Sequence, residues 1–137
     1  MTTTSPRAPS PAPTTNQLID QATTAGLKVC WTPPTYHRQA AYGHAAGTIW
    51  LRRDLTDAEA RSLLAHELGH HHYGDHGPQP PDVEARAWRY AARLLIPERT
   101  YALAEMQHGH HVPALAEALH VTAEAIQAYQ SILRRAA

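Results

Sequence analysis

Residues 66–70, His66-Glu67-Leu68-Gly69-His70, decide how this sequence is interpreted, because they fall inside a well-specified helix. Thr56 followed three residues later by Glu59 has the pattern of a capping box, which starts a helix. Gly74 is a natural C-terminal stop. A helix is therefore predicted from about 57 to 73. Its buried face is predicted from apolar residues at helical spacing: Ala60, Leu63, Leu64 and Leu68.

The two histidines of this segment have the spacing of metal ligands. His66 and His70 are four residues apart, so on a helix their imidazoles project from one face and can bind one ion. Zinc lowers the pKa of a bound water to about 7, and Glu67 is placed to take the proton as that water attacks a carbonyl. We therefore predict a Zn²⁺ site with Glu67 as the catalytic base. The alternative is a set of exposed histidines in a chain that contains 11 of them.

A catalytic zinc has three protein ligands and one open position, so a third ligand is needed. The next predicted helix, about 83–96, offers Asp82 and Glu84 near its start. Glu84 shares a face with Ala87 and Ala91, which directs it toward the apolar stripe, where a carboxylate needs a partner. Asp82 is interpreted as an N-cap. We predict Glu84 as the third metal ligand; the alternative is a solvated first-turn acid favoured by the helix dipole.

The rest of the chain predicts an α+β domain. A short helix (16–25), a strand (27–31) and a hairpin or meander (42–52) precede the motif helix, which indicates a small antiparallel sheet followed by helices. Further helices are predicted at 98–107, 113–119 and 123–134. Residues 1–15 are rich in Thr, Pro and Ala and predict a disordered leader. The interpretation is a leader at 1–15 and one domain at 16–137.

Composition excludes several classes of function. Twelve basic residues balance twelve acidic ones, so a large nucleic-acid footprint is not indicated and direct nucleic-acid binding is not expected. Neither a secretory signal nor an apolar run of membrane-spanning length is visible. The single cysteine, Cys30, permits no internal disulfide and fits a reducing compartment. We expect a cytoplasmic protein without membrane contacts.

The motif and its flanks resemble the ImmA/IrrE family of metallopeptidases, of bacterial or phage type. The resemblance rests on Leu-Ala-His-Glu-Leu-Gly-His at 64–70, on Glu84-x-x-Ala87, and on Tyr-Ala-Ala-Arg-Leu-Leu-Ile-Pro at 90–97. It covers about 49–97, and the segment 115–122 also resembles the family's C-terminal helices. It implies a minimal zincin-like domain with a gluzincin-like site: His66, His70 and Glu84 on zinc, with Glu67 as the base.

Two functional hypotheses follow. The first is a zinc-dependent endopeptidase that hydrolyses a peptide bond in a protein substrate; the resemblance implies a helix-turn-helix repressor as that substrate. The alternative is a non-catalytic, zinc-stabilised protein-binding regulator of the anti-repressor type. The family often has Asp or Asn four residues after the ligand Glu, where this chain has Trp88. A partner that orients a ligand histidine must then come from elsewhere or be absent.

Overall fold

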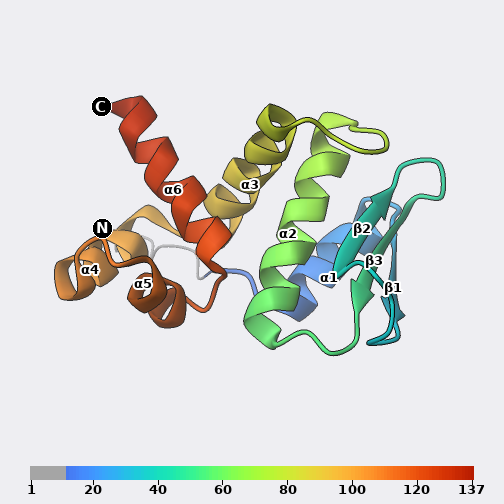
Figure 1. Cartoon of the computed structure of the whole chain (residues 1–137), viewed down its shortest axis with the longest axis horizontal. Coiled ribbons are helices and arrows are strands. Elements are labelled where there is room, and N and C mark those ends of the chain that lie inside the picture. Colours follow the sequence, from blue (N-terminus) through green and yellow to red (C-terminus); the bar gives the residue numbers. More distant parts are fainter. Residues whose placement is uncertain (1–11) are drawn as a thin grey trace, which may run out of the picture.

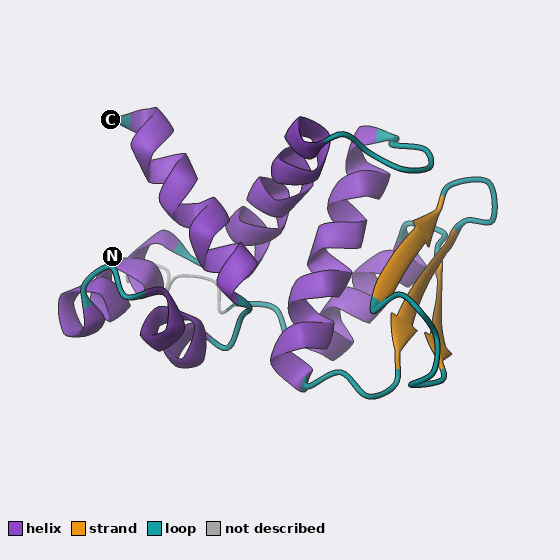
Figure 2. Ribbon diagram, viewed as in Figure 1, coloured by secondary structure: helices purple, strands orange, loops and turns teal. Residues whose placement is uncertain are grey.

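The computed structural model describes residues 12–137, which form six helices and a three-stranded sheet (Figures 1 and 2). The helices are α1 (Thr15–Thr24), α2 (Asp57–Tyr73), α3 (Pro81–Leu95), α4 (Glu98–His108), α5 (Val112–Leu119) and α6 (Ala123–Ala136). The strands are β1 (Lys28–Thr32), β2 (Ala40–Gly43) and β3 (Thr48–Arg52). The predicted α+β class is confirmed. Most of the predicted leader lies outside the described residues.

The sheet is mixed, whereas the sequence predicted an antiparallel one. Its strand order is β1-β3-β2; β3 pairs antiparallel with β2 and parallel with β1. The expected hairpin is the β2–β3 pair. The prediction was wrong for β1, because the segment after it carries the chain past β3 to the far edge, so that β2 does not pair with β1. Ile49 and Leu51 of the middle strand are fully buried and face the helices.

Helix α2 is the centre of the molecule: the sheet lies on one side of it and α3 on the other, while α1 packs against both α2 and β1 (Figure 2). Its predicted bounds are confirmed, and so is the capping box: Glu59 N–H donates to Thr56 Oγ1 at 3.2 Å, and Thr56 N–H donates to Glu59 Oε1 at 3.0 Å. Gly74 ends the helix with φ of 68°, a left-handed conformation that glycine adopts without steric cost. Because α2 contacts α1, α3 and both β2 and β3, most of its length is buried.

Arg61, on α2, is a buried cation that ties three other segments to this helix. Its side chain donates to the carbonyl oxygens of Pro13, Leu119, His120 and Leu95, at 2.7, 3.3, 2.7 and 3.2 Å. Two of these carbonyls end helices, Leu95 in α3 and Leu119 in α5, where the helix dipole favours a positive charge. Arg61 thus connects α2 to α3, to α5 and to the chain just before α1.

Helix α3 packs along α2 and brings its first turns beside the motif (Figure 1). It begins at Pro81, two residues before the predicted start, with Pro80 as the N-cap. Proline at the first helical position is pre-organised for a helix. Gly69 permits the close approach of the two helices, because a Cβ there would lie 2.9 Å from the Ala87 carbonyl oxygen.

Helix α6 packs against α3 and α5, and α4 packs against α5, so these helices lie on the side of α3 away from the sheet (Figure 1). Tyr101 and Tyr129 join α4 to α6 through ring centroids 4.3 Å apart. Within residues 12–137, none of the helices has the length and apolarity needed to cross a membrane.

Candidate metal centre

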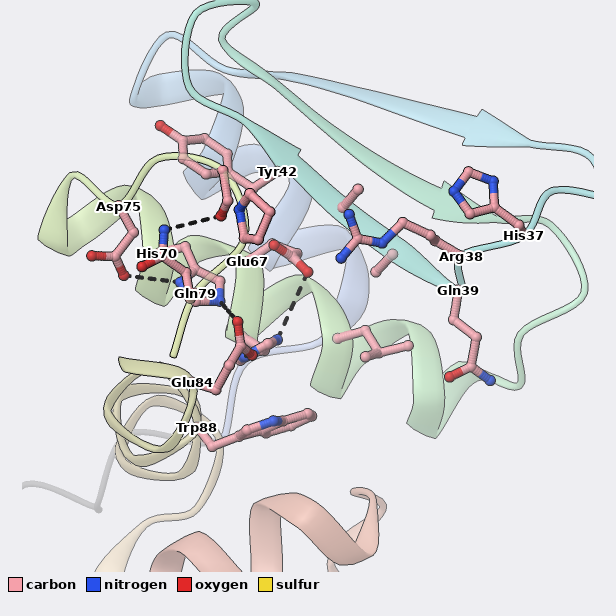
Figure 3. Close-up of a pocket in the computed structure, with 16 residues that line it drawn as sticks. His37, Arg38, Gln39, Tyr42, Glu67, His70, Asp75, Gln79, Glu84 and Trp88 are labelled. Carbon is pink, nitrogen blue, oxygen red and sulfur yellow. Dashed lines mark hydrogen bonds and ion pairs between the residues drawn. The ribbon is translucent and has the colours of Figure 1, made fainter. Parts of the chain in front are cut away.

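The two motif histidines and Glu84 converge at one point in the structure, and Figure 3 shows His70 and Glu84 facing each other there. His66 Nε2 lies 2.9 Å from Glu84 Oε2, and His70 Nε2 lies 3.0 Å from Glu84 Oε1. The two imidazoles come from successive turns of α2, and the carboxylate comes from the first turn of α3. The sequence placed all three residues at one site, and the structure brings them together. Asp82, the other acid considered, is exposed and does not line the cleft; Pro80, not Asp82, is the N-cap.

Glu67 lies beside this group. His66, Glu67 and His70 are all buried, and each offers one ligand atom within 4.8 Å of the others. The Glu67 carboxylate is 3.7 Å from His66 Nδ1. The Glu84 side chain, by contrast, is 40% exposed, since it opens onto the cleft and is not buried in the apolar stripe as the sequence suggested. Glu84 is therefore the more accessible carboxylate, and Glu67 the more desolvated one.

The environment of His66 fits a metal ligand. Burial, together with the nearby His70, lowers the pKa of His66 to about 3, so its imidazole is neutral and keeps a lone pair for an ion. Neither ring nitrogen makes a hydrogen bond to the described residues, although Nε2 is close to Glu84. A buried polar atom without a hydrogen bond needs another partner. Two imidazole nitrogens and a carboxylate are a donor set that suits zinc and similar divalent ions.

Trp88 holds the ring of His66 in place. The two rings stack with centroids 4.3 Å apart and planes 10° apart. Trp88 lies one turn after Glu84 on α3, at the position where the family pattern often has Asp or Asn. It therefore supports a ligand histidine by stacking and not by a hydrogen bond.

Asp75 is the hydrogen-bonding partner of the other histidine, and the sequence interpretation missed it. Its Oδ2 accepts from His70 Nδ1 at 2.9 Å, and its Oδ1 accepts from Arg86 Nη2 at 2.8 Å. A carboxylate on the second ring nitrogen is a common support for metal-binding histidines. The available signal was an acid directly after the glycine that ends the motif helix.

The pKa of Glu67 is raised to about 7. Burial is the main cause, because removal from water disfavours the charged carboxylate; the charge of Glu84 raises the pKa further, whereas His70 and Arg38 lower it. Figure 3 shows the Arg38 guanidinium directed toward Glu67 from the segment before β2. A carboxylate with a pKa near neutrality is suited to accept and return a proton.

The centre opens into a cleft of about 700 Å³. Ala40 and Tyr42 of β2 line one side, and Gln79 and Trp88 line the other. Strand β2 is at the edge of the sheet and, among residues 12–137, pairs only with β3, so its outer edge offers a place for another extended chain to pair. The cleft thus combines the candidate metal centre, a buried carboxylate and the outer edge of β2.

Comparison with known proteins agrees with this geometry. A family model described as the IrrE N-terminal-like domain, a peptidase family, matches residues 22–129. The match includes every residue of the centre. No curated protein matches the chain. The chain belongs to the IrrE N-terminal-like family, as the motif predicted, and its function is of the metallopeptidase type. Together with the His-Glu-His cluster, membership indicates a bound metal ion.

Proposed function

We propose that this member of the IrrE N-terminal-like family is a zinc-dependent endopeptidase. In this proposal His66, His70 and Glu84 hold Zn²⁺, and Glu67 is the general base. The observation that carries it is the convergence of two imidazole Nε2 atoms on the two oxygens of one carboxylate, at 2.9 and 3.0 Å. Thiolate ligands are not part of the site, because the single cysteine, Cys30, is on β1 and exposed.

Glu67 supplies the proton transfer. Zinc, when bound, would polarise the peptide carbonyl and favour deprotonation of the attacking water. The Glu67 carboxylate accepts the proton that this water loses as its oxygen bonds to the carbonyl carbon. It then returns the proton to the amide nitrogen as the C–N bond breaks. Its raised pKa, about 7, supports both halves of this transfer near neutral pH.

The cleft supports an extended peptide as the substrate. The outer edge of β2, which pairs with no other strand of the described residues, lies alongside the centre, and a peptide strand can pair with such an edge. The resemblance to the ImmA/IrrE family supports a more specific proposal, in which the substrate is a helix-turn-helix repressor in the cytoplasm.

Removal of the metal provides the first test. We expect the purified protein to cleave members of a proteome-derived peptide library, as read by mass spectrometry. Dialysis against a chelator should abolish cleavage, because the substrate carbonyl loses its electrophilic partner, and stoichiometric Zn²⁺ should restore it. Magnesium, which prefers oxygen ligands, should not restore it.

Two outcomes would contradict the proposal. One is cleavage that survives complete metal removal; the other is a zinc-loaded protein that cleaves neither the peptide library nor a helix-turn-helix repressor offered as substrate. The second outcome would favour a zinc-stabilised binding regulator.

A further inference from the structure

Asp75 is placed by the end of α2. The left-handed Gly74 turns the chain back, and Asp75 N–H donates to the His70 carbonyl oxygen at 2.9 Å. The same residue's carboxylate then reaches His70 Nδ1 at 2.9 Å. Main chain and side chain of Asp75 therefore both contact His70. The Asp75 side chain is 9% exposed, so this contact is shielded from water.

Arg86 fixes the second oxygen of this carboxylate. Its Nη2 lies 2.8 Å from Asp75 Oδ1, and its guanidinium lies 4.1 Å from the centroid of the Tyr73 ring. Tyr73 is the last residue of α2 and Arg86 lies in the second turn of α3. Arg86 therefore joins the end of α2 to the helix that carries Glu84, while it neutralises the charge of Asp75.

We infer that Asp75 and Arg86 are positioning residues that set the metal affinity of the centre through His70. This inference rests on the proposed function. Because the Asp75 carboxylate only accepts, its contact requires the proton of His70 on Nδ1. That tautomer leaves the Nε2 lone pair directed at Glu84, where the metal would bind. Arg86 keeps the carboxylate in the orientation that this contact needs.

The two predicted ligand histidines are thus supported by different physical means. His66 makes no hydrogen bond to the described residues from either ring nitrogen, and it is held by stacking on Trp88. His70 is held by the hydrogen bond that its Nδ1–H donates to the carboxylate of Asp75, a residue outside both helices. Trp88 stands where the family pattern often has an acid, and the carboxylate that contacts a ligand histidine comes instead from Asp75 in the α2–α3 connection.

The affinity of the protein for Zn²⁺ directly tests the positioning role of Asp75 and Arg86. We expect Asp75→Ala to weaken Zn²⁺ binding by about 10- to 100-fold, measured by competition with a chromophoric chelator. Asp75→Asn should recover part of that loss, because its amide oxygen still accepts from Nδ1–H but carries no charge. Arg86→Ala should weaken binding less than Asp75→Ala does. Asp20→Asn is the matched control, because Asp20 is exposed on α1. The Zn²⁺ affinity of this variant should equal that of the wild type.

The His70 tautomer is a second readout, which a purely structural role would not change. In ¹⁵N NMR spectra of the zinc-loaded protein, we expect His70 to carry its proton on Nδ1, with the signal shifted and exchanging faster with water in Asp75→Ala. If Asp75→Ala does not fold, the near-isosteric Asp75→Asn decides: weaker zinc binding than Asp20→Asn supports the inference. Equal affinity overturns it.

These results also separate the inference from the proposed function. Wild-type protein that binds zinc and cleaves peptide, together with unchanged affinity in the Asp75 variants, would overturn only the positioning role. Wild-type protein that binds no zinc would overturn both.

Discussion

Replacement of Glu67 by Gln is expected to lower the rate of peptide hydrolysis by about 10²- to 10⁴-fold while zinc stays bound. Gln has nearly the same shape but cannot accept the proton from the attacking water. The three proposed metal ligands are unchanged, so the metal content should equal that of the wild type. The measurement is kcat/KM on a cleaved peptide, with zinc per chain determined on the same sample.

Glu117→Gln is the matched control for this experiment. Glu117 is an exposed residue of α5 that does not line the cleft, so the same chemical change there should leave the rate unaltered. Full activity in Glu67→Gln would show that Glu67 is not the base. Loss of zinc in Glu67→Gln would instead show that Glu67 is a metal ligand. Its ligand atom lies within 4.8 Å of those of both histidines, close enough for that role.

Replacement of Arg61 by Met is expected to lower the free energy of unfolding by about 3–5 kcal/mol. Each buried acceptor that loses its donor costs about 1–3 kcal/mol. Arg61 donates to four carbonyl oxygens, three of which are only partly buried and can bond to water in the variant, so the total is less than four full losses. Met preserves much of the side-chain volume, so the loss reports the hydrogen bonds more than a cavity. Urea-induced unfolding followed by circular dichroism measures the change.

Arg53→Met is the control for this prediction. Arg53 is exposed, and its side chain makes no ion pair or hydrogen bond to the described residues, so its removal should change the unfolding free energy by less than about 0.5 kcal/mol. Equal stabilities for the Arg61 and Arg53 variants would contradict the structural role given to Arg61.

Helix α2 was predictable because its signals are local. Thr56, Glu59 and Gly74 specify where it begins and ends through contacts within one turn, and the spacing of His66 and His70 then places both imidazoles on one face. Glu84 could be assigned from its position in the next helix and from the resemblance. Gly69, inside the motif, has no Cβ and so allows α3 to approach α2 closely.

What the sequence did not reveal depends on contacts between distant segments. The pairing of β1 with β3 is decided by the path of the connection after β1, which has no periodic signal. Arg61 shares a helix face with Leu64 and Leu68, and a cation in an apolar stripe is interpretable only once the carbonyls that surround it are known. Asp75 depends on the turn that follows Gly74 and on Arg86, which lies 11 residues later in the chain.

Trp88 shows how a departure from a family pattern becomes interpretable once structure is available. From sequence, a tryptophan in place of an acid removed an expected partner of a ligand histidine. In the structure it stacks on His66, while the supporting carboxylate for His70 comes from Asp75. Both imidazoles are thus oriented, which supports a competent metal centre.

Zinc content per chain, measured by elemental analysis of untagged wild type and Glu84→Ala, tests the central claim most directly. The three-ligand centre predicts about one zinc per wild-type chain and a large loss in the variant, because Glu84 contacts both Nε2 atoms. A wild-type protein that takes up no zinc when it is supplied, or a variant that keeps its full complement, would contradict the account.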